Sequence, residues 1–238
     1  MFLDKMAHGA AARLAGRRSA PALHPYGVLC SGTLDVPGGA GGEWGVPWLD
    51  RAGSYPVSVR WSRALGLPGR LPDGLGLAVR VPDADGPGNH LDLLFTSSGS
   101  GRLARHLPLP RPRPLTGPYS TLLSYRVGAR RRVLAAFPEP GPAGGASTVG
   151  ADLAALRQAI IRGPVRFDLC AAAPDEPWCP IATLTLRAVR DDTPSGTLSY
   201  DPYAHCLPRL HPTRRLSRLR TTAYAGSRRG RGGERPRR

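Results

Sequence analysis

Several signals that commonly identify a function are missing from this 238-residue sequence. Lys5 is the only lysine, and aromatic residues make up 6% of the chain. No apolar run reaches the roughly eighteen residues that a transmembrane helix needs. The chain also has no P-loop, no G-x-S-x-G elbow and no dinucleotide fingerprint, so the usual motifs of nucleotide-binding proteins and serine hydrolases are absent.

Cysteine is scarce as well, and its spacing is uninformative. The four cysteines are far apart and include no C-x-x-C pair, so they predict no zinc or other metal site among the cysteines. The N-terminal residues have no apolar core typical of an export signal. We therefore expect four reduced thiols and a cytoplasmic protein. These cysteines are Cys30, Cys170, Cys179 and Cys206.

The positive charge is concentrated at one end of the chain. The formal net charge is +16, and the stretch from Arg209 to Arg238 holds eleven arginines and one acid, Glu234, which gives 11 − 1 = +10 of that total. The last twelve residues, 227–238, are expected to form a disordered basic tail. Such a tail predicts weak electrostatic contact with nucleic acid or anionic lipid.

Glycine and proline are abundant, and short apolar runs lie between them. Their counts of 30 and 26 favour a turn-rich β protein over a helical bundle. Segment 152–161 carries the helical stripe Leu153, Leu156 and Ile160, and two further helices are expected at 1–20 and 214–224. The strands are expected at 28–36, 55–61, 75–81, 90–95, 122–125, 132–137, 165–171 and 181–189.

This series of strands predicts a mainly β (α+β) fold, a closed antiparallel barrel with a few peripheral helices. A barrel of about eight strands is filled by its own side chains or holds one small ligand. The barrel domain is expected to cover residues 21–226, and a homodimer is an open alternative.

The segment HPYGVLCSGTLDV places His24 just ahead of the first expected strand. An imidazole titrates near neutrality, so a histidine held at the end of a strand can take and return a proton. His24 is therefore the first candidate catalytic residue.

Five segments in order resemble the catalase superfamily, the haem-containing barrel enzymes. The first is the His24 segment with its Gly27, Gly32 and Val36 spacing, and it is followed by VSVRWS, DGLGLAVRV, GNHLDLLFTS and PYSTLLSYRVGARRR. The resemblance implies a haem cofactor and a peroxide or other small-molecule substrate. It also implies roles for three residues: His24 as the acid–base group, Ser62 as the residue that orients His24, and Arg60 as the partner of a haem propionate. The same resemblance makes Arg80 a further candidate for binding the cofactor.

The chain departs from that pattern at three sites, one of which is Pro21, where the family has an arginine three residues before the distal histidine. Thr96 stands where the family has an asparagine that orients peroxide, and a hydroxyl has fewer donors than an amide. The family holds iron through a tyrosine on a helix, and the one candidate here, Tyr200, follows Gly196 where an arginine is expected. The nearby prolines oppose a helix, so YDPY is expected to be a loop. His90, His205 or Cys206 are alternative iron ligands.

Two other functions remain open from the sequence. One is a haem-free barrel acting on another small molecule, such as a phosphodiesterase-type hydrolase. It would bind a divalent ion through Asp83, Asp85, His90 and Asp92, although the same stretch is typical of a hairpin turn. The other is a non-enzymatic protein that binds its partners through the basic tail.

Overall fold

The computed structural model describes residues 26–39, 44–65, 71–139, 149–150, 152–190 and 199–213. The helical elements in these ranges are α2 (Pro47–Asp50), the 3-10 turn η1 (Ala104–His106) and α3 (Leu153–Arg162). The strands are β1 (Tyr26–Val36), β2 (Gly53–Arg63), β3 (Leu75–Val81), β4 (Leu91–Ser97), β5 (Tyr119–Ser120), β6 (Tyr125–Val127), β7 (Arg130–Pro138), β8 (Val165–Ala172), β9 (Cys179–Val189) and β10 (Leu210–Pro212).

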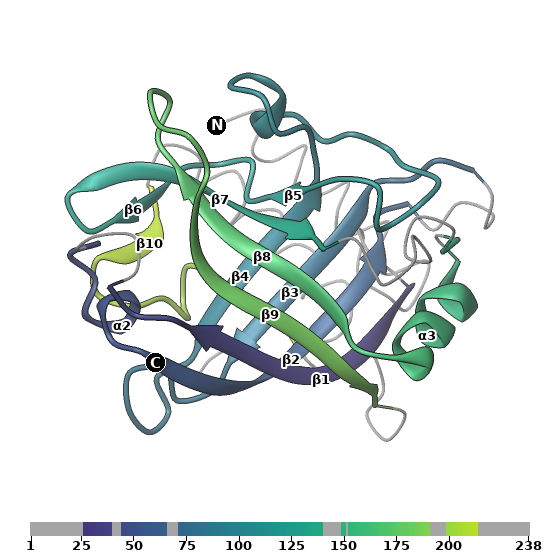
Figure 1. Ribbon diagram of the computed structural model, residues 1–238, viewed down its shortest axis with the longest axis horizontal. Coiled ribbons are helices and arrows are strands. Elements are labelled where there is room, and N and C mark those ends of the chain that lie inside the picture. Colours follow the sequence, from purple (N-terminus) through teal and green to yellow (C-terminus); the bar gives the residue numbers. More distant parts are fainter. Residues whose placement is uncertain are drawn as a thin grey trace, which may run out of the picture.

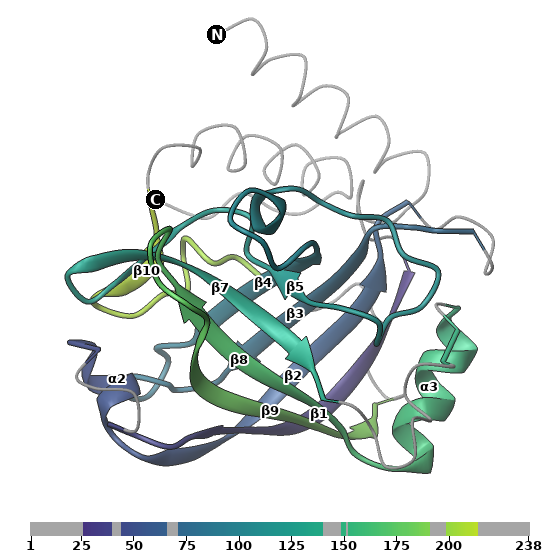
Figure 2. The ribbon, with the colours of Figure 1, turned by 45° about the horizontal axis from the view of Figure 1, so that its top comes forward.

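The sheet closes on itself as an antiparallel barrel. Its order is β10-β6-β7-β5-β4-β3-β2-β1-β9-β8, and a further pairing of β7 with β8 joins the two ends. Eight strands, β7-β5-β4-β3-β2-β1-β9-β8, therefore form the ring, and β6 and β10 extend it at one end. Figures 1 and 2 show β2–β4 as one wall of the barrel and β8 and β9 as the wall facing it, with β1 between β2 and β9. The expected closed antiparallel barrel is confirmed.

The barrel core forms because the strands alternate. Successive side chains of a strand point to opposite faces, so every second residue points inward. Trp61 lies at the centre with no exposed surface, and its ring meets Phe167 of the opposite wall edge-on at 5.7 Å. Its Nε1 donates a hydrogen bond to the Tyr119 hydroxyl at 3.1 Å. That hydroxyl in turn donates to the carbonyl of Pro114 at 2.7 Å, so the buried polar atoms of this cluster are satisfied.

Helix α3 begins where the sequence predicts it. Asp152 is its N-cap, and the carboxylate accepts a hydrogen bond from the backbone N–H of Ala155 at 2.7 Å. Leu156 and Ile160 are buried, and the helix packs on β9 and β1 at one end of the barrel (Figure 1). No helix among the residues described is long and apolar enough to cross a membrane.

Seven of the expected strands are observed with small shifts at their ends, but the strand expected at 122–125 is wrong. The chain pairs earlier as β5 and later as β6, and Leu122 between them has a φ of +57°. The Thr121 hydroxyl donates to the carbonyl of Leu123 at 2.7 Å, and the Leu123 N–H returns to the Thr121 carbonyl at 2.6 Å. This local turn replaces the ladder hydrogen bonds that a strand would need.

Some expectations lie outside the described residues. They are the helices at 1–20 and 214–224, the tail at 227–238 and His24, which precedes β1 by two residues.

The four cysteines are free, and burial raises the pKa of both Cys30 and Cys170 to about 12.

Candidate functional site

The outward-pointing residues of β1–β4 form a face that is far more polar than the core behind it. Cross-strand pairing sets its rows. One row runs Gly27, Ser62, Gly76 and Thr96, the next runs Leu29, Arg60, Ala78 and Leu94, and the third contains Ser58, Arg80 and Asp92. We call these residues the β1–β4 outer face. The register thus brings four predicted site residues, Arg60, Ser62, Arg80 and Thr96, onto a single surface.

The first row places two hydroxyl groups on either side of a glycine. Ser62 and Thr96 both pair with Gly76, from β2 and β4 respectively. Adjacent strands lie about 4.8 Å apart, so the two hydroxyl-bearing residues are roughly 10 Å from each other. The Ser62 hydroxyl, on a residue only 3% exposed, lies 3.4 Å from the Gly76 carbonyl. Ser62 is thus held in place inside the row.

Arg60 is almost entirely buried on this face, with 8% of its surface exposed. Its guanidinium reaches back toward β1. A Cβ at Gly27 would lie 3.0 Å from both the Arg60 Cζ and the Ser62 Cβ, so the glycine makes room for them. Gly76 and Ala78 of β3, which pair with Ser62 and Arg60, are small residues beside this buried positive charge.

Arg80 and Asp92 form an ion pair in the third row. The Arg80 Nε and Nη2 donate to the two Asp92 oxygens at 2.7 and 2.6 Å. This two-point contact raises the pKa of Arg80. The Asp92 side chain has no exposed surface, whereas 14% of the Arg80 side chain is exposed.

The same ion pair holds segment 199–213 against the barrel. Arg80 donates to the Ser199 carbonyl at 2.8 Å, and Asp92 accepts from the Asp201 N–H at 2.7 Å. The Nδ1 of His205 lies 2.8 Å from the same Asp92 carboxylate. A buried charge pair therefore fixes the position of the residues on either side of Tyr200.

Tyr200 lies buried beside this pair. The Arg80 Cζ is 5.2 Å from the centre of its ring. Burial raises the pKa of the Tyr200 phenol, while the positive charges of Arg80 and Arg60 oppose that rise. The phenol oxygen has no hydrogen-bond partner among the residues the structure describes. A buried hydroxyl without a partner is costly, which marks this oxygen as a place where a ligand could bind.

The loop expected around YDPY is confirmed. Residues 199–206 form turns and no helix. Asp201 shapes this loop, because its carboxylate accepts hydrogen bonds from the N–H groups of Tyr203 and Ala204. Sequence reasoning identified Tyr200 but missed the Arg80–Asp92 pair that positions it. The sequence carries the signal, because Arg80 and Asp92 lie in two successive expected strands, 75–81 and 90–95.

The alternative ligands lie at the edge of this site. His205 contacts Asp92, and the His90 ring meets the His205 ring edge-on at 5.6 Å. The Cys206 thiol donates to the Tyr203 carbonyl at 3.8 Å, and burial raises its pKa.

The divalent-metal hypothesis is wrong for the residues described, which contain no group of three or more His, Cys, Asp or Glu side chains that could hold a metal ion. Asp92 points to Arg80, whereas Asp83 accepts from the Gly88 N–H at 2.7 Å inside a turn. The stretch forms the hairpin turn between β3 and β4, because glycines and aspartates favour the backbone conformations that a tight turn requires.

Comparison with known proteins places the fold. No family model and no curated protein sequence matches the chain. Among solved structures, a fungal catalase matches with a TM-score of 0.65 at 13% identity, covering 89% of this chain and 59% of its own. A bacterial catalase matches with a TM-score of 0.65 at 14% identity, covering 89% of this chain and 57% of its own. The chain has a catalase-like fold and spans somewhat less than three-fifths of these catalases' length.

Proposed function

We propose that this chain is a divergent catalase-like haem protein with peroxide-dependent oxidoreductase activity. The observation that carries the proposal is the composition of the β1–β4 outer face with Tyr200 beside it. A buried arginine and an unsatisfied buried phenol lie together on a barrel that resembles a fungal and a bacterial catalase in fold.

These residues fit a haem. Gly76 and Ala78 carry little or no side chain, so a flat macrocycle would meet little steric hindrance over β3. The guanidinium groups of Arg60 and Arg80 suit the anionic propionates, since a guanidinium offers a planar fork to a carboxylate. Tyr200 would supply an oxygen ligand; burial raises the pKa of its phenol, and the nearby arginine charges offset part of that rise. When bound, the haem would supply a redox-active iron.

The substrate would be a small molecule, a peroxide. His24 would hold and return the proton of that peroxide, as an imidazole does in general acid–base catalysis. Ser62 would fix the orientation of the His24 ring through a hydrogen bond. Thr96 would donate one hydrogen bond to the substrate. It lacks the second donor of an amide, which favours weak catalase or peroxidase activity over the full reaction.

The experiment is a haem titration of the full chain followed by absorbance. The proposal predicts saturable binding at one haem per chain. It also predicts at least tenfold weaker binding for Arg60→Gln, a loss of about 1.4 kcal/mol per decade. Arg162→Gln removes the same charge from the exposed end of α3 and should bind like the parent. Non-saturating absorbance in the parent chain would overturn the proposal.

A further inference from the structure

A second polar feature lies on the exposed face of the extension formed by β10, β6 and β7. In this small sheet His211 pairs with Arg126, and Arg126 pairs with Arg131. Both arginines are exposed, and directly paired residues share a face. We call these three residues the basic row.

The neighbouring arginines of β7 behave differently. Arg130 and Arg132 alternate with Arg131 and point to the other face, where Arg130 pairs with Asp175 and both arginines pair with Glu176. This pairing lowers the pKa of Glu176. Arg126 donates only to the Ala129 carbonyl, and neither Arg126 nor Arg131 has a carboxylate partner in the described ranges. Like charges directly opposite each other destabilise a sheet, so the basic row lowers the stability of this hairpin.

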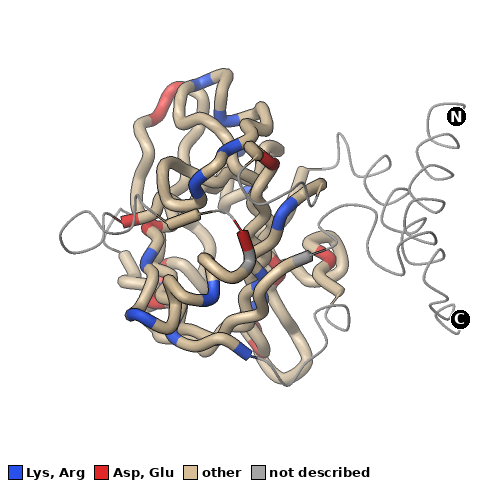
Figure 3. The backbone as a smooth tube through the Cα atoms, turned by 90° about the vertical axis from the view of Figure 1, so that its right-hand side faces the viewer, with Lys and Arg blue, Asp and Glu red and all other residues tan. Residues whose placement is uncertain are grey.

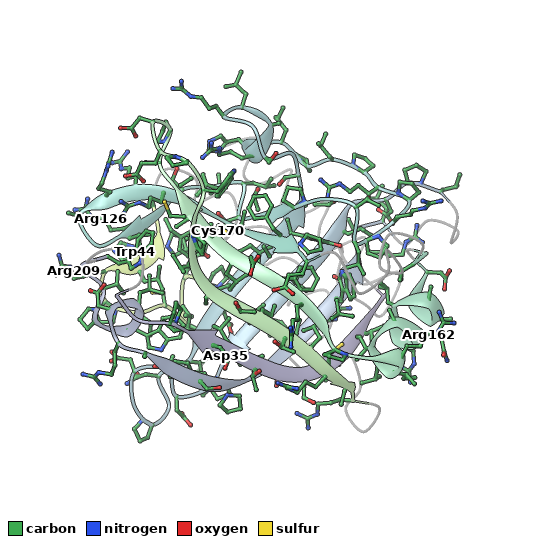
Figure 4. The ribbon with its side chains drawn as sticks, in the orientation of Figure 1. Asp35, Trp44, Arg126, Arg162, Cys170 and Arg209 are labelled. Atoms are coloured by element: carbon green, nitrogen blue, oxygen red, sulfur yellow. The ribbon has the colours of Figure 1, made fainter. Side chains whose placement is uncertain are left out.

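Arg209 adds a strained residue at the same end. The Leu210 N–H donates to the Leu207 carbonyl at 3.0 Å, which closes a tight turn with Pro208 and Arg209 at its centre. Arg209 has a φ of +65°, the conformation that this turn position normally gives to glycine. The Gly128 N–H at the tip of the β6–β7 hairpin donates to the Arg209 carbonyl at 2.8 Å. Figure 4 shows Arg126 and Arg209 at one end of the barrel, with Trp44 close to both and Arg162 at the far end.

We propose that the basic row binds the phosphate backbone of a nucleic acid. Arginine positions are scattered over the described fold (Figure 3), so net charge alone selects no surface. What selects this one is the like-charge pair of Arg126 and Arg131, whose repulsion an anionic partner would relieve, and the left-handed Arg209 is a second unfavourable feature at the same end of the barrel. Strain of this kind is a reason to look for a function.

The apolar side chains decide between nucleic acid and a membrane. Surfaces that insert into a bilayer carry exposed apolar residues. In the part of the chain the structure describes, none of the exposed large apolar residues lies on β6, β7 or β10; they are Leu65, Leu71, Leu103, Leu107, Leu109 and Ile161. Trp44 is 9% exposed and lies under Arg132, so it is not offered to a base. The row therefore suits a charged backbone and reads no sequence.

The dimensions agree with this partner. Three paired strands span about 10 Å, and a duplex presents one negative charge per roughly 1.7 Å of its axis. The row thus faces several phosphates at once. Each neutralised phosphate contributes about −0.9 to the slope of log K against log salt.

The test is a salt series with a fluorescent DNA duplex and the full chain. The Arg126→Gln/Arg131→Gln variant should bind at least tenfold more weakly at low salt, with a slope shallower by about 2. The Arg162→Gln control should keep the parent slope. Circular dichroism checks the fold of each variant, and all of them keep the rest of the basic sequence.

Two results would overturn the proposal. One is a slope that does not change in the Arg126→Gln/Arg131→Gln variant. The other is a variant that keeps its DNA affinity but loses binding to vesicles of phosphatidylcholine and phosphatidylserine, which would assign the row to a lipid surface.

Discussion

The two faces of β1–β4 follow the same alternation and have opposite chemistry. The inward face carries Trp61 and branched apolar residues with satisfied polar atoms. The outer face carries Arg60, Ser62 and Asp92, which are equally buried but polar. Packing of the inward face is enough to fold a barrel of this size. The buried polar residues of the outer face are not needed for that packing, so we expect them to have a functional role.

Two of the buried tyrosines, Tyr119 and Tyr200, illustrate this comparison. Tyr119, on the core side, accepts from Trp61 and donates to Pro114. Tyr200, beside the outer face, has a phenol oxygen with no partner in the described part of the chain. Burial raises the pKa of both phenols. One hydroxyl is satisfied within the fold, and we propose that the other binds a ligand.

The largest effect is expected from the core. Trp61→Ala should lower the free energy of unfolding by about 3–5 kcal/mol, since it empties the centre of the barrel. Denaturant unfolding followed by circular dichroism measures it. A loss below about 1 kcal/mol would mean that the inward face does not hold the barrel together.

The ion pair of the outer face should come next. Asp92→Ala leaves the Arg80 guanidinium without its carboxylate and should cost about 3 kcal/mol, the low end for a broken buried pair because Arg80 is partly exposed. The Arg80→Met/Asp92→Leu double variant should recover much of this loss. If it were as unstable as Asp92→Ala, the pair would contribute stability of its own beyond neutralising a buried charge.

The tyrosines allow a matched test. Tyr119→Phe should cost about 1–2 kcal/mol, because it leaves the Trp61 donor without its acceptor. Tyr200→Phe should be neutral or slightly stabilising, since it removes a buried hydroxyl that has no partner. Thermal or denaturant unfolding of the two variants side by side reports the difference. Equal losses would contradict the distinction drawn here.

The smallest effect concerns Glu176 and depends on pH. Its pKa is lowered, chiefly by Arg132, so its pairing stabilises the fold above the unfolded pKa of about 4.3 and is lost as pH falls through the lower folded value. Glu176→Gln should therefore be less stable than the parent at pH 7 and should match it in strong acid. Unfolding curves across that range check it, and a gap that stays constant would be the contrary result.

Much of the barrel could be predicted because its strands alternate cleanly. The alternation of segment 55–61 predicts that Val57, Val59 and Trp61 share one face, and all three are buried. The failure at 122–125 came from a side-chain hydrogen bond of Thr121, which hydrophobic periodicity does not record.

The site was predictable only in part. Motif order gave Arg60, Ser62, Arg80 and Thr96, and strand register then brought them together. Asp92 was placed in a metal cluster because nearby acids looked like ligands. Its true partner comes from the neighbouring strand, and a pairing between strands depends on register, which one sequence fixes poorly.

The most direct test of a ligand site beside the outer face is the absorption spectrum of the haem-loaded chain, with Tyr200→Phe and Tyr119→Phe measured alongside. The account predicts a Soret band in the parent that shifts in Tyr200→Phe and stays in place in Tyr119→Phe. A Tyr200→Phe spectrum identical to that of the parent would contradict the central claim that the unsatisfied phenol holds the cofactor.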